Sequence, residues 1–379
     1  MADLAYINPD IFNWARARAQ MSEEDLSRTL GVRLDKVVAW AEGSKKPTFN
    51  QAQRLAGKLH IPFAFFFLPA PPPDELPLPD LRTVANQGIE GASVNLKDII
   101  DSVMRRQEWY KEYLQDQGAE RLGFIGSASL NSSPSLVAGD IKRTLELDNL
   151  NPQGLNWEEY QRKIVVAAED VGILVMRSGI VENNTRRPLS VSEFRGFAIS
   201  DPLAPVVFIN LRDAPAARLF TLIHEIAHLW LGQSGISSVK PNEHRREEQF
   251  CNAVAGEFLA PEREMLVLWR EGAELQDNVT NLARNFHVSK YVIIRRALDL
   301  RLITQESYQE YYSALVRSFN ESDGGGGDFY AIARNKNSAK FSKALLGETL
   351  TGRVLLRDAS RLLGVAPAKL KTYALEIGA

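Results

Sequence analysis

Cysteine is almost absent from this sequence of 379 residues, in which Cys251 is the only one. An internal disulfide framework is therefore excluded, and a reducing compartment is expected. No apolar run approaches the roughly 20 residues that a membrane-spanning helix needs. The first residues, Met1–Tyr6, also lack the basic segment of a signal peptide. We therefore expect a cytoplasmic protein that has no membrane partner.

A strong net charge of either sign is also lacking. The formal net charge is −2 at pH 7, with 45 Lys or Arg against 47 Asp or Glu. Such a balance gives the whole chain no attraction to nucleic acid, so any DNA binding must be local. The apolar content of 45% is that of an ordinary globular protein. A chain of 379 residues is long for one core, which predicts two or three domains.

Histidine is scarce as well, yet two of the five histidines stand four residues apart, in His224-Glu225-Ile226-Ala227-His228. An apolar stripe at helical spacing, formed by Leu219, Ile223, Ile226 and Trp230, predicts a helix with the histidines on the opposite face. Two imidazoles four residues apart on a helix can reach the same metal ion. Glu225 projects about 100° away, where a carboxylate can act as a general base without binding the metal.

Two histidines do not complete a catalytic zinc site, which needs a third protein ligand. Ser234 stands where metzincins carry a third histidine, so that pattern is excluded. On a predicted helix downstream, Glu248 shares a face with Asn252 and Ala255. An apolar stripe lies on the other face and consists of Cys251, Val254 and Phe258.

We predict Glu248 as the third ligand, because its side chain points away from the apolar stripe of its helix. Asn252, one turn further on, is placed to orient the carboxylate of Glu248. Glu247 and His244 remain alternatives for the third ligand, and an acidic pair at a helix N-terminus can also be a solvated cap.

The first 68 residues predict a separate helical module. Asn8 and Pro9 open a first helix, and capping-box patterns begin helices after Ser22 and Thr48. Gly31 ends the second helix, and a very short turn leads to a third at about 34–42, which predicts a helix-turn-helix. Six of the eleven residues in Pro69–Pro79 are proline, and they predict a semi-rigid linker.

The middle of the chain changes from helical to strand periodicity. Helices are predicted at about 95–116 and 157–171, and short apolar runs predict strands at 173–176, 195–200 and 205–210. Three strands followed by a metal-binding helix match the small sheet of a zincin peptidase. The edge strand of such a sheet pairs with an extended peptide, and we expect it to be Gly196–Ser200 or Val206–Asn210.

The C-terminal third contains two further helix-turn-helix patterns. The first, Leu282–Leu298, turns at His287, and we expect it to pack against the peptidase or to grip the substrate rather than to bind DNA. The second, at about 359–370, is expected to form a small docking subdomain. Between them Gly324–Gly327 predicts a flexible hinge, because no Lys-Ser or Lys-Thr of a phosphate-binding loop follows it.

The N-terminal module resembles the Cro/C1 (XRE) type of helix-turn-helix in Leu26–Val32 and Val37–Thr48, including Trp-x-x-Gly-x-x-x-Pro-Thr. The resemblance implies four DNA contacts: Arg33 and Lys36 toward the major groove, and Lys45 and Lys46 near phosphates. Residues 1–82 carry ten basic and ten acidic side chains, which favours weak DNA affinity. The alternative is a four-helix module that holds a partner protein or a second copy of the chain, as in a homodimer.

The segment Arg195–Pro261 resembles the ImmA/IrrE family of metallopeptidases. The match rests on the two histidines with Glu225 and on the segment Glu248–Pro261. The resemblance implies that Zn²⁺ is held by His224, His228 and Glu248, with Glu225 as the catalytic base. It further implies cleavage of a helix-turn-helix repressor in phage, mobile-element or stress-response regulation. For stabilisation of the oxyanion the candidates are His244, Arg195 and Tyr330.

The sequence thus predicts a mainly α fold with a small α+β zincin-like peptidase core and an N-terminal helix-turn-helix domain of four to five helices. The predicted domains are 1–68, the linker 69–82, the peptidase 83–261 and a helical region 262–379. The preferred function is a DNA-associated zinc endopeptidase that cleaves a transcriptional repressor. The alternative is an XRE-family transcription regulator, or an antitoxin-like DNA-binding protein, whose zincin fold is a sensor or scaffold without turnover.

Overall fold

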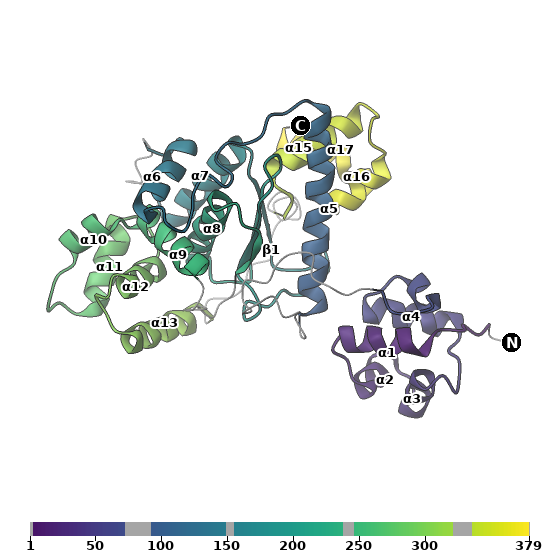
Figure 1. Cartoon of the computed structure of the whole chain (residues 1–379). Coiled ribbons are helices and arrows are strands. Elements are labelled where there is room, and N and C mark those ends of the chain that lie inside the picture. Colours follow the sequence, from purple (N-terminus) through teal and green to yellow (C-terminus); the bar gives the residue numbers. More distant parts are fainter. Residues whose placement is uncertain (1–2, 73–91, 149–154, 238–245, 321–335, 379) are drawn as a thin grey trace. The chain divides into compact units, whose positions relative to one another are not determined.

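A computed structural model describes residues 3–72, 92–148, 155–237, 246–320 and 336–378 (Figure 1). The chain divides into two compact units, Met1–Leu76 with Gly88–Asp98 and Pro77–Gln87 with Ile99–Ala379. Most of the predicted linker, the Gly-rich segment, His244 and Tyr330 lie outside the described residues. Among the described helices, none is both long and apolar enough to cross a membrane.

The described residues 3–72 of the N-terminal unit form the helices α1 (Pro9–Arg18), α2 (Glu23–Leu30), α3 (Leu34–Ala41), α4 (Phe49–Leu59) and the short 3-10 helix η1 (Phe63–Phe67). The predicted caps are confirmed, because the side chain of Asn8 accepts a hydrogen bond at the start of α1, and Ser22 and Thr48 form capping boxes. Gly31 ends α2 with a φ of 66°, which glycine adopts without steric cost. Phe12, Trp40 and Leu55 lie in the core of this unit.

A mixed four-stranded sheet lies in the second unit, in the order β1-β3-β2-β4. The strands are β1 (Leu174–Ser178), β2 (Gly196–Ile199), β3 (Val206–Asn210) and β4 (Gly235–Ser237). Strand β3 pairs in parallel with β1 and antiparallel with β2, and β2 also pairs antiparallel with β4. All residues of β2 and β3 are buried, as expected for inner strands.

The two strands that we expected at the edge of the sheet are both inner strands. That prediction was wrong because β4 covers the side of β2 that would otherwise be free, and β1 covers β3. Strand β4 has three residues, which are too few to show an alternating pattern. Within the described residues the edges of this sheet are therefore β1 and β4.

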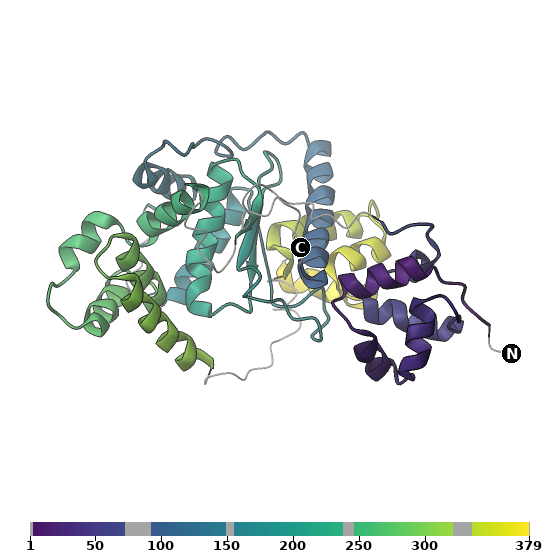
Figure 2. The same cartoon turned by 60° about the horizontal axis from the view of Figure 1, so that its bottom comes forward.

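Helices cover both faces of the sheet. The helix α8 (Pro215–Trp230) packs on β2 and β3, and α9 (Arg246–Leu259) packs on α8. Two further helices flank them, α6 (Pro134–Thr144) against α9 and α7 (Trp157–Asp170) beside β1. Both Figure 1 and Figure 2 show α8 and α9 on one side of the sheet and α5 (Val94–Asp116) on the other. The predicted helical and strand segments around the metal motif are confirmed, and α6 was missed.

The remaining helices are α10 (Glu262–Leu268), α11 (Leu275–Asn285), α12 (Lys290–Asp299), α13 (Gln305–Asn320), α15 (Ala339–Leu350), α16 (Leu356–Leu363), the 3-10 helix η3 (Pro367–Lys369) and α17 (Leu370–Ile377). The predicted turn between α11 and α12 is confirmed, since His287 has a φ of 53°. Helix α12 packs on α8 and α9, which agrees with the expected packing role. Its Arg295 and Arg296 pair with Asp299 and Glu257 within the fold.

Candidate metal centre

Helix α8 brings the two histidines of the motif into the interior of the fold. Pro215 stands in its first turn, where the missing N–H has no helical partner to lose. The predicted apolar stripe is buried, with Leu219, Ile223 and Ile226 all at 0% exposure. The opposite face is closed as well, because His224 is 5% exposed and Glu225 and His228 are 0% exposed. The helix is therefore buried all round, and its polar side chains face other protein groups.

Helix α9 places Glu248 opposite both imidazoles. Glu248 Oε2 is 3.3 Å from His224 Nε2, and Oε1 is 3.3 Å from His228 Nε2. The two Nε2 atoms are 3.2 Å apart. In the part of the chain that the structure describes, these side chains form a group that could hold a metal ion, with the ligand atoms within 4.8 Å of one another. The helical pattern favoured Glu248 over Glu247 for this position, and the structure brings Glu248 to the histidines.

The donor atoms fit a tetrahedral zinc ion. Two donors that each lie about 2.1 Å from a tetrahedral ion are about 3.4 Å apart. The distances of 3.2 to 3.3 Å among the three side chains match this edge length. Two imidazoles and one carboxylate are also a donor set found in catalytic zinc sites. The three residues present thus fit Zn²⁺ and would leave a fourth position open.

The imidazoles of His224 and His228 keep the carboxylate of Glu248 ionised. Burial disfavours the charged form of each group, but the Glu248 carboxylate outweighs burial at His224 and raises its pKa above the usual value. At His228 burial dominates and lowers the pKa. Burial also opposes ionisation of Glu248, yet the two imidazoles hold its pKa well below the usual range. A metal binds a deprotonated carboxylate and a neutral imidazole, so the shifts at Glu248 and His228 favour metal binding, whereas the shift at His224 favours the protonated form.

Two inner strands supply the surroundings of the centre. Glu225 lies with its side chain against Gly196 of β2, so the general base predicted from the sequence is enclosed between α8 and the sheet. The preceding residue, Arg195, is 8% exposed. It donates hydrogen bonds to the hydroxyls of Tyr291 and Tyr312, both at 2.7 Å. The ring of Tyr291 packs edge-on against Phe220, one turn before His224.

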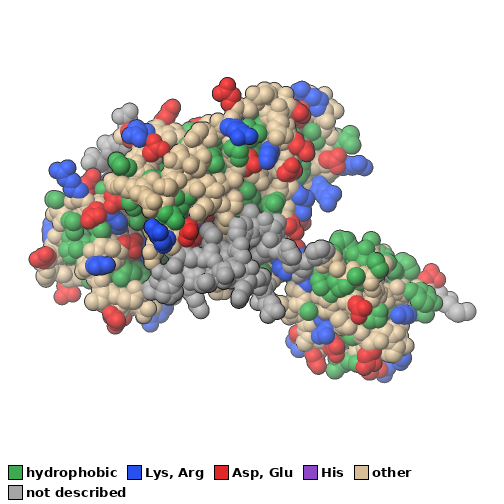
Figure 3. Space-filling model, in the orientation of Figure 1, with side chains coloured by type: hydrophobic (Ala, Val, Ile, Leu, Met, Phe, Trp, Pro, Cys, Tyr) green, Lys and Arg blue, Asp and Glu red, His purple; other side chains and the backbone are tan. Residues whose placement is uncertain are grey.

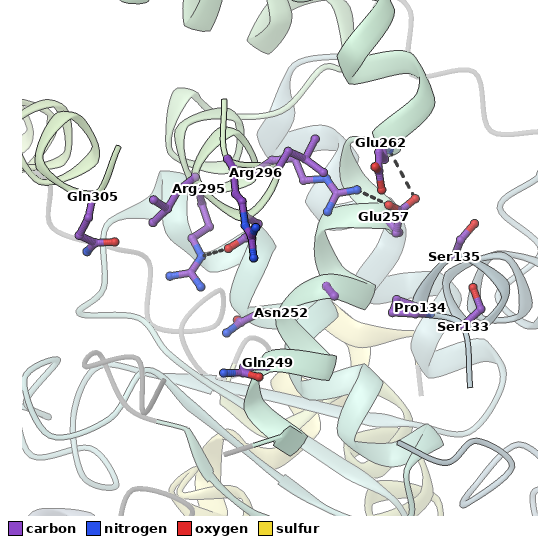
Figure 4. A pocket seen from close by; sticks show the side chains of 15 residues that line it. Ser133, Pro134, Ser135, Gln249, Asn252, Glu257, Glu262, Arg295, Arg296 and Gln305 are labelled. Carbon is purple, nitrogen blue, oxygen red and sulfur yellow. Dashed lines mark hydrogen bonds and ion pairs between the residues drawn. The ribbon is translucent and has the colours of Figure 1, made fainter. Parts of the chain in front are cut away.

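A pocket of about 830 Å³ lies along α9, between α6, α10 and α12. Figure 4 shows Gln249 and Asn252 of α9 facing Arg295 of α12 across this pocket. Gln249, which follows Glu248 on α9, lines this pocket, whereas His224, His228 and Glu248 do not. Asn252 lines the pocket one turn beyond Glu248, and its predicted role as a partner of that carboxylate stays a prediction.

The four predicted DNA-contact residues all lie in the N-terminal unit. Arg33 precedes α3 and forms an exposed ion pair with Asp35, with 3.1 Å between Nη2 and Oδ2. Lys36 is exposed on the first turn of α3, and Lys45 is exposed and Lys46 half-buried in the following loop. The first three side chains are thus at the surface, and their contact with DNA stays a prediction.

The candidate metal centre lies in a segment of the chain that is similar to a known peptidase domain. Residues 168–298 match the IrrE N-terminal-like domain of the M78 peptidases. This M78 segment runs from the end of α7 to α12 and contains the sheet, α8 and α9. The match supports the resemblance to the ImmA/IrrE family and a metallopeptidase type of enzyme. Residues 337–376 match a domain of unknown function. None of the curated proteins compared with the chain matches it.

Some features of the M78 segment carried no recognisable signal in the sequence. Nothing in the sequence distinguishes Gly196 from the other 24 glycines, since its role depends on how close α8 approaches β2. Tyr291 and Tyr312 reach Arg195 over 96 and 117 residues. Such contacts depend on tertiary structure, and no local pattern predicts them.

Proposed function

We propose that the protein is a zinc-dependent endopeptidase that cleaves a helix-turn-helix transcriptional repressor, and that its N-terminal unit associates with DNA. The single observation that supports it best is the geometry of His224, His228 and Glu248 beside a fully buried Glu225. The match of residues 168–298 to a peptidase family supports the class of reaction. The nature of the substrate rests on the resemblance to the ImmA/IrrE family.

His224, His228 and Glu248 would hold the metal. When bound, zinc supplies a Lewis acid that polarises the scissile carbonyl and makes water a better nucleophile near neutral pH. Glu225, whose position is fixed by the packing of α8 on β2, accepts a proton from the attacking water at a carboxylate oxygen. It then passes that proton to the amine that leaves.

The pocket along α9 offers space for substrate side chains beside the helix that carries Glu248. Its volume of about 830 Å³ is large enough for more than one side chain. Charged side chains of both signs line the pocket. Arg295 and Arg301 are basic, and Glu257 and Asp299 are acidic. We therefore expect a polar peptide to occupy it, rather than a purely apolar one.

The test uses the full chain, co-expressed with a candidate helix-turn-helix repressor. Wild-type protein and the Glu225→Gln variant are compared, and repressor fragments are identified by mass spectrometry. Glu120→Gln is the matched control, since Glu120 is an exposed glutamate outside the M78 segment. Zinc content is measured by elemental analysis for all three proteins.

We expect Glu225→Gln to keep one zinc per chain and to leave the repressor intact, because only the proton acceptor is lost. The Glu120→Gln protein should cleave as the wild type does. Cleavage by Glu225→Gln at the wild-type rate would rule out the peptidase assignment. Salt-dependent binding to its own promoter, with no repressor fragments from the wild type under any inducer, would instead favour a transcription regulator with a zincin scaffold.

A further inference from the structure

The C-terminal segment from Lys336 to Gly378 differs in charge from the rest of the chain. It carries eight Lys or Arg and three Asp or Glu, a net charge of +5, in a protein whose overall formal charge is −2. Six of these basic side chains are exposed, namely Lys343, Arg353, Arg357, Arg361, Lys369 and Lys371. Figure 3 shows Lys and Arg side chains, with Asp and Glu side chains among them, at the end of the second unit where Figure 1 places α15 to α17.

This segment, which we call the basic three-helix segment, folds as a helix-turn-helix. Helix α15 packs on both α16 and α17, and η3 connects these two helices. Gly364 ends α16 with a φ of 68°, which allows a sharp turn. The core of the segment is fully closed and consists of Phe341, Leu345, Leu346, Ala359, Leu363, Val365, Leu370 and Tyr373, each at most 2% exposed. Helix α17 thus stands where such a motif has its DNA-recognition helix.

Contacts with the rest of the second unit involve one side of the basic three-helix segment. Arg106 Nε donates a hydrogen bond to the carbonyl of Leu362 at 2.8 Å, and the ring of Phe341 packs edge-on against Trp109 with 5.8 Å between centroids. Glu169 accepts from the backbone N–H of Ala339 at 3.1 Å. These contacts involve α15 and the end of α16, and they leave the outward side of α17 at the surface.

The side chains exposed on α17 after its first residue are Lys371, Thr372, Leu375 and Glu376. Lysine and threonine contact phosphates and sugars, which position a protein on a duplex without reading its sequence. The set contains no Asn or Gln, which make bidentate contacts with adenine, and no Arg, whose planar fork suits guanine. Arg357 and Arg361 stand one turn apart on α16 and are exposed, so they extend the positive surface.

We propose that the basic three-helix segment binds double-stranded DNA through its phosphate backbone, independently of sequence. The major groove of B-form DNA admits a helix such as α17, whereas the major groove of A-form RNA is too narrow for side chains to read. Positive charge on the exposed side supplies the electrostatic attraction. This site is separate from the N-terminal unit, and it does not depend on the peptidase function.

Binding of the full chain to a labelled 30-base-pair duplex of arbitrary sequence tests the proposal by fluorescence anisotropy. The variant Arg357→Glu/Arg361→Glu/Lys371→Glu is compared with the control Arg121→Glu/Arg162→Glu/Lys163→Glu, which reverses three exposed basic residues elsewhere in the second unit. Both variants change the net charge by the same amount. Each is measured with and without Lys45→Glu/Lys46→Glu, which removes two predicted DNA contacts of the N-terminal unit.

We expect the Arg357/Arg361/Lys371 variant to bind at least about tenfold more weakly at low salt, and the control to stay close to wild type. The slope of log affinity against log salt should fall in magnitude by about two to three, since each phosphate contact contributes about 0.9. The same loss should persist in the Lys45→Glu/Lys46→Glu background. Replacement of the three residues by Gln should give a smaller loss, which guards against misfolding caused by charge reversal.

Equal binding by the test and control variants would overturn the proposal. Equal competition by a duplex RNA of the same length would overturn the assignment to DNA. Leu356 and Leu375 are 54% and 82% exposed, and exposed leucines can also hold a second copy of the chain. The oligomeric states of the wild type and of both variants are therefore compared by sedimentation. A change of oligomeric state with unchanged DNA affinity would overturn the proposal and assign the surface to a second copy of the chain.

Discussion

Gly196 on β2 lies directly against the side chain of Glu225 on α8. A Cβ atom added to Gly196 would stand 2.7 Å from Glu225 Oε1 and 2.8 Å from the carbonyl oxygen of Phe208. Phe208 belongs to the adjacent strand β3, so its backbone is held by the sheet and has little freedom to move away. Glycine at position 196 is therefore what allows the carboxylate of Glu225 to occupy its place beside the proposed metal ligands.

The substitution Gly196→Ala should consequently impair catalysis without removing the metal. A displacement of the order of 1 Å in a reacting group costs about 100-fold in rate, and we expect a loss of that size or larger. Zinc content should stay at the wild-type value, because the atoms nearest to the added methyl group belong to Glu225 and Phe208 rather than to the three ligands. Gly139→Ala is the control, since a Cβ on that α6 glycine meets no atom within 4 Å. Wild-type cleavage of the co-expressed repressor by Gly196→Ala would contradict this account.

Two adjacent glutamates of α9 permit a matched test of the third ligand. Glu248 faces both imidazoles at 3.3 Å, whereas Glu247 is its neighbour on the chain. Both Glu248→Gln and Glu247→Gln remove one negative charge from the same helix turn. Competition with a chromophoric chelator should show zinc affinity reduced by about 100-fold or more in Glu248→Gln, and little changed in Glu247→Gln. The reverse order of affinities would show that the metal uses the other carboxylate.

Local sequence patterns predicted the elements that carry the centre. The spacing of His224 and His228, with an apolar stripe at helical period, predicted α8 and the convergence of both imidazoles. Capping boxes after Ser22 and Thr48 predicted the starts of two helices, because those hydrogen bonds span three residues. Such features depend on neighbours in the chain, so they can be recognised without knowing the fold.

The order of the strands could not be predicted in this way. Whether β2 lies inside or at the edge of the sheet depends on β4, which pairs with it from about 40 residues away, at Gly196 and Ser237. The proximity of Gly196 to Glu225 likewise depends on how α8 rests on the sheet. The alternation of apolar residues identified strands, but it carried no information about their partners.

Arg195 and Asp213 form a buried pair beside the metal centre, with 3.6 Å between Nε and Oδ2. Burial raises the pKa of Asp213, and the Arg195 guanidinium opposes that rise. Removing the arginine alone leaves a buried carboxylate, so Arg195→Met should lower the free energy of unfolding by about 3 to 5 kcal/mol.

The double variant Arg195→Met/Asp213→Asn should recover part of this loss, because the uncompensated charge is gone. Urea unfolding of the wild type, of Arg195→Met, of Asp213→Asn and of the double variant gives the coupling energy between the two residues. Strictly additive losses would show that the pair does not interact.

The buried side chain of Lys336 should make the free energy of unfolding depend on pH. Its side chain is 2% exposed, and burial together with the charge of Arg106 lowers its pKa from 10.5 to about 7, although Glu182 opposes the shift. Between these two pKa values the unfolded chain holds a proton that the folded chain has released. The contribution of Lys336 to the free energy of unfolding therefore rises with pH through this window, by about 2 kcal/mol from pH 7 to 9.

Lys336→Met should remove that increment and should stabilise the fold most below pH 7, where the wild type buries a charged ammonium group. Lys343→Met, at an exposed position of α15, is the control and should keep the wild-type pH dependence. The free energies of unfolding of the wild type and both variants are measured with urea at pH 6, 7 and 9. If the free energy of unfolding of Lys336→Met changed with pH as that of the wild type does, Lys336 would keep its ordinary pKa in the folded state.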